Sequence, residues 1–181
     1  MSHVILGLLM LWPQSLYELT KNFEAGVSLF YSASTGSIKR SLDRLLADGR
    51  IRVASGEGPR GKKTYEITDA GRAEFRRWML ADLTGADLET AVLARVHFLG
   101  LMEAQDRPAV AAHIDERMRS DLGRLERLEA QVATVEVPAG FEEIARYQLA
   151  TLQYGLTSGR MALAWAAEYL PEPATSTATT T

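Results

Sequence analysis

The chain has 181 residues, of which 46% are hydrophobic and 24% charged, and it contains no cysteine. An apolar fraction of this size excludes wholesale disorder and allows a compact domain with a helical extension. The lack of cysteine excludes disulfide scaffolds, thiolate metal sites and thiol nucleophiles. The apolar start of the chain is too short for a membrane span and has no basic leader, so we expect a cytoplasmic protein with no membrane partner.

The net charge of −3 hides an asymmetry between the two halves of the chain. Residues 1–83 hold 12 Lys and Arg against 9 Asp and Glu, a net charge of +3, whereas residues 84–181 hold 8 against 14, a net charge of −6. Within residues 37–77 the excess rises to +5, from 11 basic and 6 acidic side chains. The N-terminal half is therefore basic enough to meet phosphate groups, and the C-terminal half is not.

Two helices are predicted at the start of the chain. Residues 3–11 form a continuous apolar run rich in leucine, and the proline that follows Trp12 ends it. Ser15, with Glu18 three residues later, has the pattern of a capping box and predicts a second helix to about residue 24.

A third helix is predicted from the N-cap Ser34 to about residue 48, with Gly49 as its stop. Its inner face is formed by Ile38, Leu42 and Leu45. At about 100° per residue, Ser37, Arg40 and Arg44 lie on the opposite face, with Lys39 beside them.

The period then changes from that of a helix to that of strands. Residues 51–53 and 64–67 alternate between apolar and polar side chains around a glycine-rich segment, which predicts a β-hairpin with a basic tip. Thr68 and Asp69 begin a fourth helix, to about residue 82. Three helices, a hairpin and a helix, in this order, predict a winged helix-turn-helix at residues 1–83.

The remainder is predicted to be helical, so the fold class is mainly α. A helix at about 88–102 is apolar on most sides and is expected to be buried. Helices at about 106–135 and 139–170 carry more apolar positions than the small N-terminal domain can cover, and the first of these two has the spacing of a coiled coil. We therefore expect a helical dimerisation and effector domain at 84–171, which makes the protein a homodimer, and a disordered tail at 172–181. The sequence leaves open whether the dimer exchanges helices.

The third helix and the wing are the predicted DNA-binding surface, because the major groove of B-DNA accepts one α-helix and the wing reaches the backbone. The residues expected to contact double-stranded DNA are Tyr17, Lys21, Ser34, Thr35, Ser37, Lys39, Arg40, Arg44, Arg60, Lys62 and Lys63.

Catalytic, metal and cofactor sites are not expected. The histidines, His3, His97 and His113, have no metal-ligand spacing, and no serine lies in a nucleophile-elbow pattern. We therefore predict that the protein is not an enzyme.

Three segments resemble the PadR family of transcriptional regulators. Residues 13–19, PQSLYEL, are similar to the opening of its second helix; residues 34–49 resemble its recognition helix; and residues 60–71 resemble its wing and following helix. The sequence departs from the family pattern at Leu16, where glycine is common, and at Lys39 and Arg40, where Tyr-Pro is common. Residues 88–170 are similar to the helical C-terminal domain of the longer members.

The resemblance implies a dimeric, ligand-responsive repressor that binds an inverted-repeat operator. It also implies a small aromatic or drug-like effector, and the residues expected to line its pocket are Trp78, His97, Phe98, Met161, Trp165 and Tyr169. Two alternatives remain open at this point: a winged helix that binds a protein partner, and a protein that sequesters small drug-like molecules.

Overall fold

The computed structural model describes residues 1–54, 63–85 and 87–172, and the chain divides into two compact units, residues 1–110 and 111–181. Each unit is described by itself. The boundary predicted at residue 83 separates two functional domains and stays a prediction. By packing, residues 84–110 belong to the first unit. The predicted tail at 172–181 lies outside the described residues from position 173 onward.

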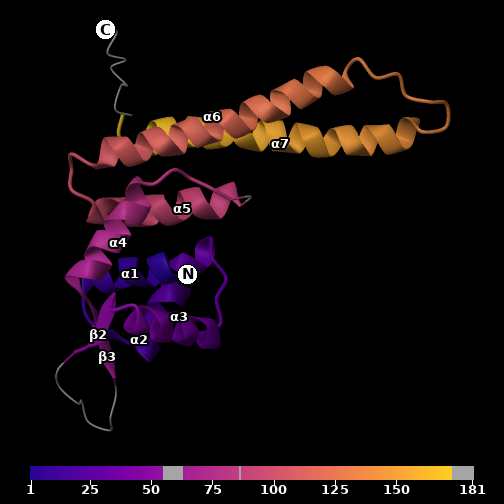
Figure 1. The fold of residues 1–181 in the computed structure, drawn as a ribbon. Coiled ribbons are helices and arrows are strands. Elements are labelled where there is room, and N and C mark those ends of the chain that lie inside the picture. The colour runs from indigo at the N-terminus through magenta and orange to yellow at the C-terminus, as the bar shows by residue number, and fades with distance from the viewer. Residues whose placement is uncertain (55–62, 86, 173–181) are drawn as a thin grey trace. The chain divides into compact units, whose positions relative to one another are not determined.

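The first unit contains the predicted winged helix-turn-helix, so the mainly helical fold is confirmed (Figure 1). In chain order its elements are α1 (Ser2–Leu11), β1 (Gln14–Ser15), α2 (Leu16–Ala25), η1 (Val27–Leu29), α3 (Thr35–Ala47), β2 (Ile51–Val53), β3 (Thr64–Ile67), α4 (Asp69–Leu80), α5 (Leu88–Phe98) and η2 (Leu99–Leu101).

Side-chain caps fix where the helices begin. At α2, the Glu18 amide donates to Ser15 Oγ at 3.3 Å, and the Ser15 amide donates to the Glu18 carboxylate at 2.8 Å, which completes the predicted capping box. Ser34 and Thr68 cap α3 and α4 without a reciprocal bond: their hydroxyl oxygens accept from the Ser37 and Gly71 amides. Gly49 has a φ of +65°, a conformation that glycine adopts without strain, so it allows the chain to turn out of α3.

The wing belongs to a three-stranded antiparallel sheet in the order β1-β3-β2. Ile51 lies opposite Ile67 in the predicted hairpin, and Gln14 of β1 lies opposite Tyr65 on the other edge of β3. β1 was not predicted, because two residues are too few for a periodic pattern. Gln14 is fully buried, donates to the Leu8 carbonyl at 2.6 Å and accepts from the Asn22 amide at 2.7 Å, so its polar atoms are paired inside the core.

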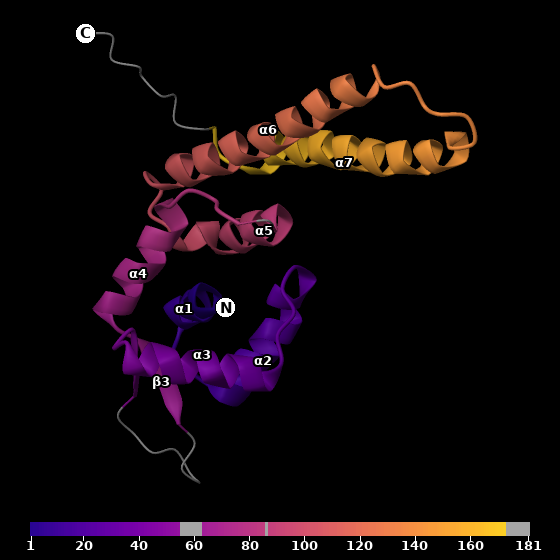
Figure 2. The same cartoon turned by 45° about the vertical axis from the view of Figure 1, so that its right-hand side comes forward.

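Helix α1 lies in the core of the first unit, in contact with α2, α3, α4 and β3 (Figure 2). Ile5 and Leu6 are completely buried, and Gly7 lies so close to Phe98 that a β-carbon would stand 2.8 Å from the ring. The other large buried side chains around α1 come from three helices, α2, α3 and α4: Leu19, Phe23, Ile38, Leu42, Phe75 and Met79.

Gly71 is required where α4 passes the end of α3. A β-carbon at this position would lie 2.1 Å from the Arg50 carbonyl oxygen, which is backbone and also accepts hydrogen bonds from the Thr68 amide and hydroxyl. We expect Gly71→Ala to lower the free energy of unfolding by about 1–3 kcal/mol, measured by urea denaturation. Gly123→Ala is the control, because a β-carbon there has only the flexible Arg127 guanidinium nearby, at 3.5 Å. Equal stability of the two variants would contradict this account.

The second unit is a pair of long helices that lie side by side, α6 (Arg107–Val132), which begins in the first unit, and α7 (Glu142–Tyr169) (Figure 1). Glycines let them approach closely: β-carbons at Gly155 and Gly159 would lie 3.2 Å from Leu125 and Leu122. Both helices are shorter than predicted at the turn between them, which contains Pro138 and Gly140 (φ +88°). Over the described residues, no helix has both the length and the apolar content that a membrane span needs.

Candidate nucleic-acid interface

The outward face of α3 carries three exposed cationic side chains, Lys39, Arg40 and Arg44. They are positioned because the inward residues Ile38, Leu42 and Leu45 are at most 3% exposed and fix the rotation of the helix. Ser37 is less exposed than these cations. It is half-buried, and its hydroxyl donates to the Ser34 carbonyl at 2.7 Å, as serine often does in the first turn.

The three cations of this face differ in whether they form an ion pair inside the protein. Lys39 Nζ lies 3.0 Å from Asp43 Oδ2 one turn further along, and this carboxylate raises the pKa of Lys39. Arg40 and Arg44 have no ion-pair partner in the part of the chain that the structure describes. Their guanidinium groups are therefore available to acceptors outside the protein, and a guanidinium can donate two parallel hydrogen bonds to O6 and N7 of guanine.

A shallow hollow of about 730 Å³ lies beside this face and brings together four of the predicted DNA-contacting residues: Tyr17, Lys21, Thr35 and Lys63. They come from α2, from the start of α3 and from the residue before β3. The other polar side chains that line it, Ser15, Thr20, Glu24 and Tyr65, were not among the predicted contacts. Lys21 donates to Glu24 at 3.0 Å, which raises the pKa of Lys21, and its ammonium lies 5.9 Å from the centre of the Tyr17 ring.

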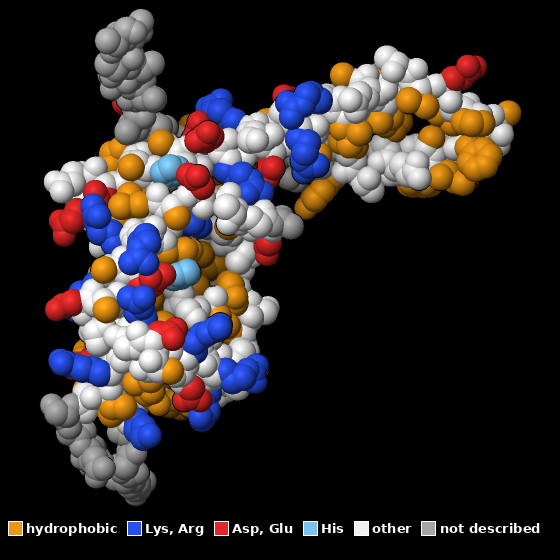
Figure 3. All heavy atoms as spheres, viewed as in Figure 1, with side chains coloured by type: hydrophobic (Ala, Val, Ile, Leu, Met, Phe, Trp, Pro, Cys, Tyr) orange, Lys and Arg blue, Asp and Glu red, His pale blue; other side chains and the backbone are white. Residues whose placement is uncertain are grey.

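The other predicted DNA contacts have different positions. Ser34 caps α3, and its hydroxyl accepts from the Ser37 amide at 3.2 Å, so part of its hydrogen-bonding capacity is used inside the helix. Arg60 and Lys62 lie outside the described residues. Figure 3 shows Lys and Arg side chains over the visible face of the first unit.

Helix α5 packs against the turn that leads into α3. The Thr90 hydroxyl donates to the Phe30 carbonyl at 3.1 Å, and the ring of His97 lies 5.5 Å from that of Phe30. His97 also packs on Gly26, where a β-carbon would lie 3.1 Å from it. Burial lowers the pKa of His97, which favours the neutral ring at physiological pH. No periodic pattern in the sequence indicated this contact.

The candidate effector residues fall into two groups, one in each unit. In the first unit, Trp78 is stacked on His3 with ring centres 5.0 Å apart, and Phe98 makes an edge contact with His97 at 4.8 Å. In the second unit, Trp165 lies 6.1 Å from Tyr169, and Met161 is 68% exposed. An effector pocket lined by these residues stays a prediction.

Arg95 is a buried cation that the sequence analysis missed. It is 4% exposed, donates to the carbonyls of Trp78 and Ala81 at 3.2 and 3.4 Å, and its guanidinium carbon lies 4.8 Å from the Trp78 ring centre. It therefore caps the C-terminal end of α4, where carbonyl groups lack helical partners. Burial lowers the pKa of Arg95. Its apolar neighbours in the sequence concealed this role.

Among the described residues, no three His, Asp or Glu side chains lie together in a way that could hold a metal ion. The arrangement of α1 to α4 with the β2–β3 hairpin places the first unit in the winged helix-turn-helix class.

Comparison with known proteins identifies the family. Residues 4–152 match the family model of AphA-like transcriptional regulators, and the chain belongs to this family. A probable transcriptional regulator of Mycobacterium tuberculosis is 33% identical over 84 residues, 45% of this chain and 44% of that protein. The negative transcriptional regulator PadR of Bacillus subtilis is 32% identical over 82 residues, 44% of this chain and 45% of that protein. The match thus spans about half the length of these relatives.

Among solved structures, Bacillus subtilis PadR in complex with operator DNA is similar over 92% of this chain and 94% of that one, with a TM-score of 0.42 and 21% identity. The predicted resemblance to the PadR regulators is confirmed by the family and its relatives. These relatives are transcriptional regulators and not enzymes.

Proposed function

We propose that this protein is a cytoplasmic homodimer that represses transcription by binding an inverted-repeat operator and responds to a small aromatic ligand. The observation that carries the proposal is the pair of exposed, unpaired guanidinium groups of Arg40 and Arg44 on the outward face of α3, within the described residues. A helix of this kind fits the major groove, and a bidentate arginine contact to guanine discriminates between bases.

The hollow beside α3 supports a second kind of contact. Lys21, Lys63, Tyr17 and Thr35 carry positive charge and hydroxyl donors on the same side as the start of α3. Groups of this type bind phosphate oxygens, which position the protein on the duplex but carry no sequence information.

Dimerisation is supported by apolar side chains of the second unit that the chain itself leaves uncovered. A stripe along one side of α7 is made of Ile144, Tyr147, Tyr154, Met161 and Tyr169, which are 53% to 76% exposed. A second copy of the chain is the occupant we propose, because two half-sites need two winged helices held at a fixed distance.

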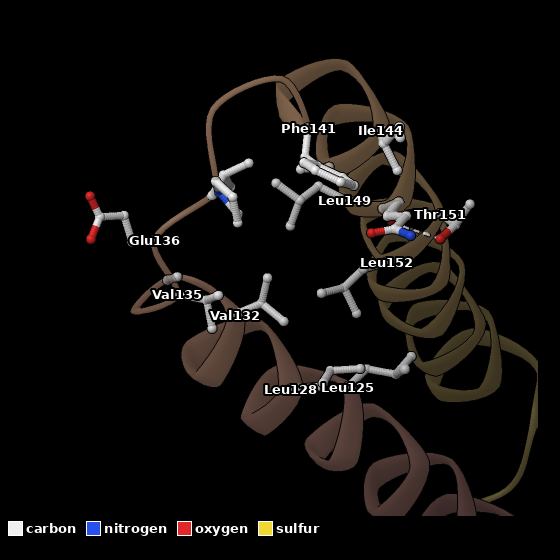
Figure 4. A pocket seen from close by; sticks show the side chains of 15 residues that line it. Leu125, Leu128, Val132, Val135, Glu136, Phe141, Ile144, Leu149, Thr151 and Leu152 are labelled. Atoms are coloured by element: carbon white, nitrogen blue, oxygen red, sulfur yellow. Dashed lines mark hydrogen bonds between the residues drawn. The ribbon is translucent and has the colours of Figure 1, made fainter.

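The end of the α6–α7 pair adds an apolar hollow of about 920 Å³. Leu128 and Val132 of α6 point toward Leu152 of α7 across it, and Phe141 and Leu149 line the same space (Figure 4). In Figure 3 hydrophobic side chains gather over this end of the helix pair. We propose that the partner's helices cover this surface in the dimer.

Repression and ligand response are the finer parts of the proposal. Repression follows the relative in Bacillus subtilis, which is a negative transcriptional regulator. The aromatic side chains Trp78, His97 and Phe98 supply the apolar and stacking surface that an aromatic ligand would need. A ligand acts on DNA binding only if it binds the two arrangements of the dimer unequally.

The contribution of Lys63 to phosphate binding can be measured by the salt dependence of DNA affinity. Lys63 is exposed at the edge of the hollow, so we expect Lys63→Ala to weaken all DNA sequences alike and to reduce the slope of log K against log salt by about one. Fluorescence anisotropy between about 50 and 200 mM salt gives this slope. An unchanged slope would show that Lys63 does not contact phosphate.

The proposed function is tested by selection of genomic DNA fragments with the purified full-length protein at about 150 mM salt. Enrichment of one palindromic site with half-sites about 10 base pairs apart, or a multiple of that spacing, is the expected result. No enrichment, with the dimer intact, would overturn sequence-specific regulation and favour a winged helix that binds a protein partner.

A further inference from the structure

One acidic side chain lies within the cationic face of α3, and another lies beside it. Asp43 is exposed on the same face as Lys39 and Arg40, one turn after them. Glu24 of α2 is exposed too and lines the hollow beside this face together with Lys21. Negative charge at both places opposes the phosphates of a bound duplex.

Each of these acids forms an ion pair with a lysine of the same surface. Lys39 Nζ lies 3.0 Å from Asp43 Oδ2, and Lys21 Nζ lies 3.0 Å from Glu24 Oε2. The four side chains are 56% to 62% exposed, so both pairs are open to a ligand that arrives from solvent. Within the part of the chain that the structure describes, the arginines of the α3 face have no such partner. The carboxylates therefore hold the lysines and leave the guanidinium groups available.

The two pairs contribute little to the stability of their helices. Solvent-exposed ion pairs are weak, and the order with lysine before the acid is the less favourable one along a helix. Glu24 also lies in the last turn of α2, where a negative charge opposes the helix dipole. By contrast, Asp115 and Arg119 of α6 form their pair in the favourable order. The fold therefore gains little from Asp43 and Glu24, whereas their charge acts directly on the candidate DNA-binding surface.

We propose that Asp43 and Glu24 are specificity-determining residues, which keep the affinity of this surface for unrelated DNA low. The inference rests on the proposed function, because it assumes that α3 and the hollow beside it face the duplex. A lysine paired with a carboxylate adds no net charge, so its approach to a phosphate releases no counterion overall. Sequence-independent binding is thereby weakened, while Arg40 and Arg44 keep the donors that read bases.

The effect differs between the operator and unrelated DNA. On unrelated DNA no base contact fixes the orientation of the protein, so the complex settles where the most cations meet phosphates and gains fully from every lysine that is released. In the operator complex the base contacts hold α3 in one orientation, and a released lysine reaches only the phosphates that this orientation offers. The two carboxylates therefore raise the ratio of operator affinity to unrelated affinity, which is the quantity that decides where a regulator binds in a genome.

The experiment uses Asp43→Asn and Glu24→Gln, which remove one charge each and keep the size of the side chain. Anisotropy between about 50 and 200 mM salt measures affinity for the operator that the wild type selects and for an unrelated duplex. At about 150 mM salt we expect each variant to bind unrelated DNA about fivefold more tightly, with a salt slope steeper by about one, and to bind the operator within about twofold of wild type. The control is Asp115→Asn, which removes the same charge from the ion pair of α6 and should leave both affinities unchanged.

Three outcomes overturn the inference. Unchanged affinity of both variants for unrelated DNA means that the carboxylates do not restrain the lysines. Equal gains on the two duplexes, or the same gains in Asp115→Asn, mean a general effect of net charge without specificity. A loss of operator affinity in Asp43→Asn means that Asp43 contacts a base, since a carboxylate can accept from the amino group of cytosine. If the wild type itself selects no sequence, the proposed function fails together with this inference, whereas any of the three outcomes with a selective wild type overturns the inference alone.

Discussion

Replacement of Tyr154 by aspartate is expected to convert the proposed dimer into a monomer and to lower operator affinity about 10²- to 10⁴-fold. Tyr154 lies in the middle of α7 and is 76% exposed in the single chain, so the fold of one protomer loses little packing when it is replaced. In the dimer the same change places an unpaired carboxylate in an apolar interface, which is strongly unfavourable. The loss of DNA affinity follows because two linked winged helices bind the second half-site at a high effective concentration.

Light scattering coupled to size-exclusion chromatography measures the mass, and anisotropy measures the operator affinity. The matched control is Ser120→Asp, which adds the same charge at an exposed polar position of α6 and not on the apolar stripe of α7. The control should remain a dimer with wild-type affinity. A dimeric Tyr154→Asp with wild-type affinity would exclude this side of α7 as the interface.

The sequence predicted the winged helix well because its determinants are local. Ser15, Ser34 and Thr68 each stand where a helix begins, and each accepts the expected backbone hydrogen bond. The change from a helical to a strand period between Gly49 and Ile51 marks the start of the wing. β1 escaped prediction because its pairing with β3 depends on residues about 50 positions away in the sequence and leaves no pattern in a two-residue segment.

The candidate site was predicted in part. Periodicity placed Arg40 and Arg44 on the exposed face of α3, since the buried side fixes the rotation of the helix. It placed Ser37 there too, but a serine one turn from the cap can fold its hydroxyl back onto the Ser34 carbonyl, and projection alone does not show this. The Lys39–Asp43 ion pair has the i, i+4 spacing that could have predicted it.

Contacts between distant segments could not be found from spacing. His97 as a residue of an effector pocket stays a prediction, and its ring packs against Gly26 and Phe30, which lie about 70 residues earlier in the chain. This contact packs α5 directly against the turn before α3.

Arg40→Ala is expected to lower operator affinity about 5- to 150-fold, which corresponds to about 1–3 kcal/mol for one bidentate contact to guanine. Affinity for unrelated DNA should fall only a few-fold, because that binding depends on charge and not on the fork of the guanidinium. Arg40 is exposed and has no ion-pair partner among the described residues, so the free energy of unfolding should not change. Selection from a randomised operator should show relaxed preference at one base pair in each half-site.

Two variants make the Arg40 result specific to base recognition. Arg40→Lys keeps the charge but lacks the planar pair of donors, so it should recover affinity for unrelated DNA and little of the operator preference. Arg119→Ala removes an exposed arginine of α6 that pairs with Asp115 at 2.7 Å, and it should leave operator affinity unchanged. If Arg40→Ala lost the same factor on operator and unrelated DNA, and Arg40→Lys restored both, then Arg40 would bind a phosphate and base recognition would depend on Arg44.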